Sequence, residues 1–83
     1  MNSTVSLDTL PIGRAGRVAG IDLPPEESQR LMEMGLTVNT EIRVLRRAPL
    51  GYPLVVLARG AQLSLRKPVA CAIRVVPTED SGS

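Results

Sequence analysis

Apolar and polar residues alternate with a period of two over much of the second half of the chain. The alternation begins after Thr40, where Ile42 and Val44 alternate with the charged Glu41 and Arg43. A period of two places successive apolar side chains on one face of a strand and therefore predicts half-buried strands. The apolar positions expected to face the core are Ile42, Val44, Leu54, Val56, Ala58, Leu63, Leu65, Ile73 and Val75.

Residues 24–36 follow a different pattern, which predicts one α-helix. Proline and two glutamates open the segment, and Gly35 suits the left-handed position that follows a helix. Leu31 and Met34 are expected to share a face, onto which Leu36 folds back in a Schellman arrangement. The helix is thereby expected to be fixed to the rest of the fold at its C-terminal end.

The remaining segments predict short elements joined by tight turns. Ser6 is expected to cap a single helical turn that carries Leu7 and Leu10. Residues 14–21, interrupted by glycines, suit a bent or bulged strand, and a short turn that opens at Pro68 leads to the last strand. The predicted fold is mainly β: a small SH3-like barrel of about five strands, with one α-helix inserted between the first and second strands.

The domain organisation follows from length and end composition. A chain of 83 residues has room for one domain and a thin core. Residues 1–6 and 77–83 are polar and are predicted to be disordered tails around a domain at 7–76. A compact barrel of this size favours a binding face over an enclosed substrate cleft.

Composition argues against several chemistries. The chain has no histidine, so a Ser-His or Cys-His nucleophilic pair is excluded, and we expect a protein that is not an enzyme. Cys71 is the single thiol and lacks partners at metal-ligand spacing; we expect neither a metal site nor a cofactor. Ten basic against eight acidic residues give a net charge of +2, too mild to indicate nucleic-acid binding.

The strongest candidate for a binding site is the loop between the two central predicted strands. Its prolines and glycine form a stiff turn that presents an apolar and an aromatic side chain, and two arginines precede it. A stiff hairpin whose prolines only prevent edge pairing is an equally good interpretation. The candidate partner-binding residues are Arg46, Arg47, Pro49, Leu50, Gly51, Tyr52 and Pro53.

The order of motifs along the chain resembles the ferrous iron transport protein A (FeoA) family over residues 7–76. The matching segments are Leu-Pro-Ile-Gly at 10–13, Arg-Leu-Met-Glu-Met-Gly-Leu at 30–36, Glu-Ile-Arg-Val at 41–44, Ala-Pro-Leu-Gly at 48–51 followed by Pro53, Leu-Ser-Leu-Arg at 63–66 followed by Ala70, and Ile-Arg-Val at 73–75. No one of these motifs is specific, but their order and spacing together are. Tyr52 departs from the family, whose loop commonly has an acidic residue there.

The resemblance implies an SH3-like barrel that binds the cytoplasmic side of a FeoB-type membrane GTPase that imports ferrous iron. Residues 1–10 lack the features of a secretory signal, and no apolar run approaches the length of a membrane span. We therefore expect a cytoplasmic protein that contacts the membrane only through its partner.

Two other functions stay open at this stage. One is the SH3-like regulatory domain of iron-dependent transcriptional repressors, although no helix-turn-helix precedes the predicted barrel. The other is a small-barrel RNA-binding module, for which one tyrosine supplies few stacking groups. Open strand edges also make a homo-oligomer possible.

Overall fold

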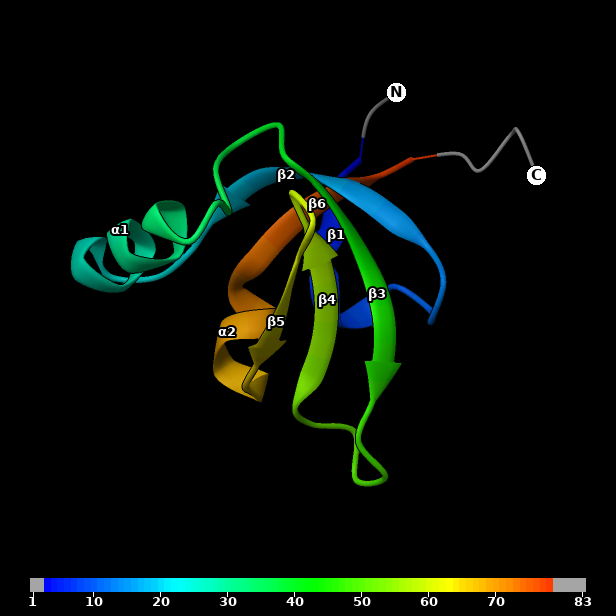
Figure 1. Ribbon diagram of the computed structural model, residues 1–83. Coiled ribbons are helices and arrows are strands. Elements are labelled where there is room, and N and C mark those ends of the chain that lie inside the picture. Colours follow the sequence, from blue (N-terminus) through cyan, green and yellow to red (C-terminus); the bar gives the residue numbers. More distant parts are fainter. Residues whose placement is uncertain (1–2, 79–83) are drawn as a thin grey trace.

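The computed structural model describes residues 3–78, which form one antiparallel sheet curled around a core (Figure 1). The strands are β1 (Val5–Ser6), β2 (Ala15–Ile21), β3 (Glu41–Arg47), β4 (Leu54–Ala58), β5 (Ala61–Leu65) and β6 (Ile73–Pro77). They are hydrogen-bonded in the order β1-β6-β2-β3-β4-β5. The helices are the 3-10 helix η1 (Leu7–Thr9), α1 (Pro25–Glu33) and α2 (Lys67–Ala72). The predicted mainly-β fold is confirmed, with α1 between β2 and β3.

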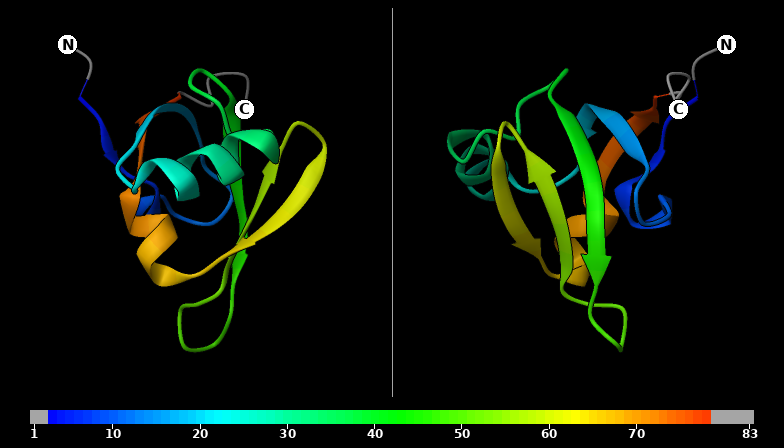
Figure 2. Two further views of the ribbon diagram at one scale, coloured as in Figure 1. Left: turned by 90° about the vertical axis from the view of Figure 1, so that its left-hand side faces the viewer. Right: turned by 45° about the vertical axis from the view of Figure 1, so that its right-hand side comes forward.

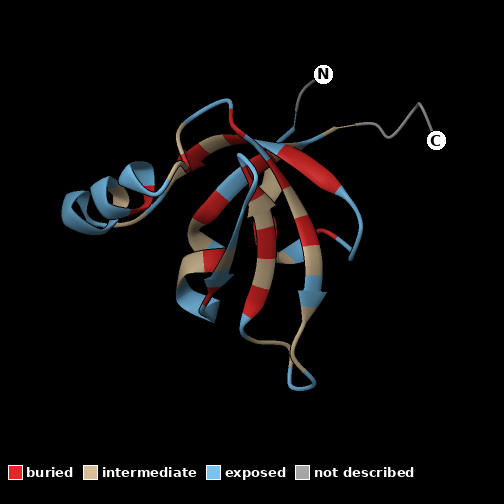
Figure 3. Ribbon diagram, viewed as in Figure 1, coloured by how far each residue is buried: buried red, intermediate tan, exposed pale blue. Residues whose placement is uncertain are grey.

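The core lies on the concave side of the curled sheet, where the period-two residues meet (Figure 3). Ile42 on β3 lies opposite Ala58 on β4, and Val44 lies opposite Val56. These side chains are essentially fully buried, and Leu63 on β5 packs against them while remaining partly exposed. The alternation therefore identified the inward face of each strand correctly.

The ordered unit extends beyond 7–76 at both ends. Val5 and Ser6, predicted to lie in a disordered tail, form β1 and pair with Val75 and Arg74 of β6. Pro77 also belongs to β6. The N-terminal pairing adds a sixth strand to the five expected. Backbone N–H and C=O groups of β6 can form hydrogen bonds with an extended segment even when the side chains of that segment are polar. The rest of the predicted tails, residues 1–2 and 79–83, lies outside the described residues.

Two local predictions near the helices need correction. The segment after β5 is a six-residue helix, α2, and not only a short turn. Met34 is 46% exposed and does not share the buried face of Leu31. The expected Schellman arrangement explains this: Gly35 adopts φ +104° and the Leu36 amide donates to the Leu31 carbonyl over 3.0 Å. Leu36 thus takes the buried position that Met34 was expected to fill.

Candidate functional site

The loop between β3 and β4, residues 48–53, projects from the end of the sheet (Figure 1). The Gly51 amide donates to the Ala48 carbonyl over 2.7 Å, which closes a four-residue turn with Pro49 and Leu50 at its centre. The Ala48 amide donates in turn to the Pro53 carbonyl over 3.2 Å. Gly51 has φ +98°, a conformation that favours glycine. The loop is therefore braced by its own backbone.

Leu50 stands at the tip of this loop and is 96% exposed. A leucine at the centre of a closed turn has no neighbouring element onto which it can fold. Burying it fully would be worth about 1.5 to 3 kcal/mol of apolar transfer free energy. The loop thus presents an apolar side chain to solvent.

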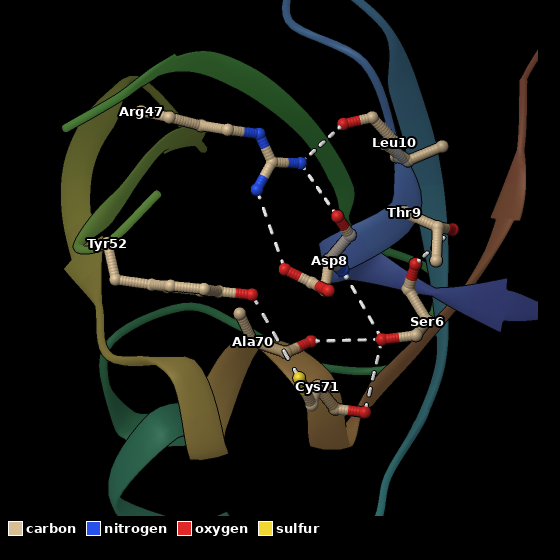
Figure 4. Close-up of polar contacts among 8 residues, drawn as sticks. All are labelled: Ser6, Asp8, Thr9, Leu10, Arg47, Tyr52, Ala70 and Cys71. Carbon is tan, nitrogen blue, oxygen red and sulfur yellow. Dashed lines mark hydrogen bonds and ion pairs between the residues drawn. The ribbon is translucent and has the colours of Figure 1, made fainter. Parts of the chain in front are cut away.

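Tyr52, expected to be presented by the loop together with Leu50, folds onto the barrel instead. Its ring is half-buried and packs against the core, and its hydroxyl lies 4.0 Å from the sulfur of Cys71 on α2 (Figure 4). The side chain therefore anchors the base of the loop.

A β-bulge in β3 precedes the two arginines that lead into the loop. The register of β3 against β4 shifts between Val44 and Arg46, so that Arg47 lies opposite the buried Leu54 while Arg46 lies opposite Val55. One extra residue in a strand sends the following side chains to the other face. Arg46 is exposed to solvent, and Arg47 points to the inner side of the sheet.

Arg47 holds the N-terminal segment against the barrel (Figure 4). Its Nη2 donates to the Asp8 carbonyl over 2.7 Å and to the Leu10 carbonyl over 3.0 Å. Its Nη1 lies 3.5 Å from a carboxylate oxygen of Asp8. A guanidinium presents five donors in a fixed plane, which suits several acceptors on one short segment. The structure therefore gives Arg47 an internal role that spacing along the chain did not reveal.

Ser6 connects the N-terminal segment, which Arg47 also contacts, to α2. Its hydroxyl donates to the Cys71 carbonyl over 3.1 Å and accepts from the Asp8 amide over 3.3 Å, which confirms the predicted cap. The pairing of Asp8 with Arg47 was not predicted, because the two residues are 39 positions apart in the chain. The only available signal was the general tendency of carboxylates to pair with arginine.

The candidate residues thus separate into two groups. Pro49 and Leu50 at the loop tip, together with Arg46, are accessible to a partner, whereas Tyr52 and Arg47 stabilise the base. Cys71 is exposed on α2. Within residues 3–78, no three Cys, Asp or Glu side chains gather as a metal ion would require. No helix in that range has the length and apolar character to cross a bilayer.

An open antiparallel sheet curled around one core, with a braced apolar loop at one end, is the architecture of a small SH3-like barrel domain. The family model described as the FeoA domain matches residues 5–77. The chain therefore belongs to the FeoA family, which is linked to ferrous iron transport, and the resemblance seen in the sequence is confirmed.

Solved structures agree with this assignment. The FeoA protein from Chlorobium tepidum is 33% identical, with a TM-score of 0.86 over 90% of this chain and 71% of that one. The FeoA of Stenotrophomonas maltophilia, described as a prokaryotic SH3 domain protein and solved with zinc, is 28% identical, with a TM-score of 0.72 over 100% and 93% of the two chains.

A manganese-dependent transcriptional repressor is also similar. It is 28% identical, with a TM-score of 0.82 over 94% of this chain and 44% of the repressor. The comparison with curated protein sequences gives no match.

Proposed function

We propose that this protein is a cytoplasmic accessory factor for ferrous iron uptake, which binds the cytoplasmic side of a FeoB-type membrane GTPase transporter and acts by contact and not by catalysis. Membership of the FeoA family supports a role in ferrous iron transport. The relative from Stenotrophomonas maltophilia is described as possibly acting as a bacterial ferrous iron transport activating factor, which is the same kind of role.

The observation that carries the proposal is Leu50, held almost fully exposed by a loop whose backbone is closed on itself. A loop whose backbone is already closed loses little backbone conformational entropy when a partner covers Leu50, so more of the burial free energy of this side chain contributes to binding. Small interfaces commonly depend on one such apolar anchor in a pocket of the partner. Arg46, exposed on the strand that leads to the loop, would add attraction to an acidic surface.

The test is a titration of the isotopically labelled protein with the detergent-solubilised transporter, followed by NMR, with and without guanine nucleotide. We expect shifts or line broadening concentrated at residues 48–53. Leu50→Ala should weaken binding about tenfold or more, as removal of an interfacial anchor does. A folded Leu50→Ala variant with unchanged affinity would contradict the loop assignment.

Val38 offers a matched control for Leu50. It is also an exposed apolar residue, at 55%, but lies in the segment before β3, at the opposite end of that strand from the loop. Val38→Ala should leave the affinity for the transporter unchanged. Equal losses from the two substitutions would indicate a non-specific apolar effect in place of a defined interface.

A second candidate function is supported by the similarity to the manganese-dependent repressor, which contains this fold within a longer chain. In that role the domain would bind a transcriptional regulator in place of a transporter. A spectrum that stays unchanged at high transporter concentration, and then shifts on addition of a metal-dependent repressor, would favour this function over the first.

A further inference from the structure

Strand β5 forms an open edge of the sheet. It stands last in the strand order, and among the described residues it pairs only with β4. Arg59 and Gly60, both with positive φ, form the two-residue turn between the two strands, and Ala58 lies opposite Ala61. In a hairpin of this kind the residues that flank the turn exchange hydrogen bonds, and every second pair beyond them does so too.

That alternation determines which backbone groups of β5 face outward. Ala61, Leu63 and Leu65 bond to β4, so the N–H and C=O groups of Gln62 and Ser64 point away from the sheet. Both of these residues are exposed. The free edge therefore offers two donors and two acceptors at the spacing of a strand.

This edge lacks the features that usually prevent strand addition. In natural proteins, proline, charged side chains or a very short length prevent an edge strand from pairing with a strand of another molecule. β5 has five residues, Ala-Gln-Leu-Ser-Leu, none of them charged or proline. The opposite edge of the sheet, β1, is only two residues long. An added strand would therefore find a suitable template at β5.

A groove lies beside the C-terminal end of β5. It has a volume of about 150 Å³, and its lining comes from α1, from α2 and from the residues that precede these two helices. Figure 2 (left) shows α1, β5 and α2 in this part of the molecule. The lining residues are Leu23, Leu31 and Val69, which are apolar, and Glu27, Arg30 and Arg66. Arg66 directly follows the last residue of β5. A chain laid along the edge would thus reach an apolar pocket with a mainly basic rim.

The charges around β5 indicate what such a chain must carry. Arg59 precedes the strand, and Arg66 and Lys67 follow it, with no acidic residue between positions 59 and 67. Arg66 and Lys67 are both exposed. A second copy of this chain, paired antiparallel through its own β5, would bring Arg59 of one copy toward the basic pair of the other. Like charges placed opposite each other are destabilising, so the edge suits an acidic partner better.

We propose that the free edge of β5 is a docking site for an extended segment of a partner protein, which adds as an antiparallel strand, with an uncharged centre and a carboxylate at each end. The backbone of Gln62 and Ser64 supplies the hydrogen bonds, and the flanking basic residues select the acidic ends. This site goes beyond the proposed function. It uses a surface different from the Leu50 loop and does not depend on the identity of the transporter.

The probe is the peptide acetyl-Glu-Val-Thr-Val-Thr-Val-Glu-amide, whose carboxylates would fall opposite Gly60 and Arg66 when its centre pairs with Leu63. Its matched control has lysine at both ends. Titration into the labelled full-length chain should shift the amides of residues 61–66 and slow hydrogen exchange at Gln62 and Ser64. The lysine-ended peptide should bind about tenfold more weakly, because two ion pairs become repulsive contacts.

Two variants test the mechanism. Ser64→Pro removes an N–H that β4 does not use, and proline is tolerated on edge strands, so we expect a folded protein that binds the acidic peptide at least tenfold more weakly. Ser64→Val keeps the N–H and should bind as the parent does. Arg66→Glu combined with Lys67→Glu leaves the β5 backbone unchanged and should reverse the preference between the two peptides.

Several results would overturn the proposal. They are equal binding of the acidic and lysine-ended peptides, shifts that lie outside residues 61–66, or a charge-reversed variant with unchanged preference. Self-association of the free protein through β5 would assign the edge to a second copy instead. None of these outcomes bears on the Leu50 loop, which the transporter titration tests separately.

Discussion

Replacement of Arg47 by methionine tests whether the bulge in β3 makes this side chain part of the fold. Methionine keeps most of the aliphatic stem and removes the guanidinium. Two hydrogen bonds to the carbonyls of Asp8 and Leu10 are lost, together with an ion pair of 3.5 Å. Hydrogen bonds to a charged group contribute about 1.5 to 3 kcal/mol each when buried.

The partial exposure of the pair reduces that figure. The side chains of Arg47 and Asp8 are 26% and 30% exposed, so water can replace part of each interaction. We take about 1 kcal/mol for each carbonyl bond and a few tenths for the ion pair, which gives about 2 to 3 kcal/mol in total. For a domain of this length, such a loss lowers the melting temperature by roughly 10 °C or more.

Urea unfolding followed by circular dichroism measures this effect. Arg47→Met should lower the midpoint with the slope unchanged, and Arg46→Met, on the exposed face of the same strand, should change stability by less than about 0.5 kcal/mol. Asp8→Asn should cost under about 1 kcal/mol, because the carbonyl bonds of Arg47 remain. Equal effects of the Arg46 and Arg47 substitutions would refute the assignment of an internal role to Arg47.

Two further predictions concern the helix end and the base of the loop. Gly35→Ala should lower the free energy of unfolding by about 1 to 2 kcal/mol in thermal melts, because an alanine is strained at φ +104°; no loss would contradict the Schellman assignment. Tyr52→Phe should change stability by less than about 0.5 kcal/mol, since its hydroxyl makes only a 4.0 Å contact with Cys71, whereas Tyr52→Ala should cost about 2 kcal/mol or more. Similar losses from both Tyr52 variants would show that the hydroxyl and not the ring holds the loop.

Local patterns predicted most of the elements correctly. The alternation around Ile42 and Val44 and the glycine at 35 depend on neighbours within a few positions, and both behave as expected. One error arose where a distant segment decided the outcome. Val5 is ordered because β6, some 70 positions away, offers an edge. The error at Met34 is local instead: the turn at Gly35 places Leu36, and not Met34, in the buried position.

At the candidate site, too, local features were predicted from the sequence and features that depend on long-range contacts were not. Pro49 and Gly51 in the sequence predicted a stiff loop, and the structure has one. The sequence did not show that Leu50 is exposed at the tip of the loop whereas the ring of Tyr52 packs against the core. Nor did it distinguish Arg46 from Arg47, because the face of each depends on the bulge, and the bulge depends on the pairing with β4.

By itself, the sequence determined the fold class, the inward positions of the strands, the course of α1 and the membership of the FeoA family. These rest on short-range periodicity, on turn residues and on the order of motifs, all of which are local properties of the chain. Only the tertiary structure decided the extent of the ordered unit, the inward turn of Arg47 and Tyr52, and the open edge of β5. Each of these depends on contacts between backbone and side-chain groups that are far apart in the sequence. The pairing and register of the strands determine which of those contacts form.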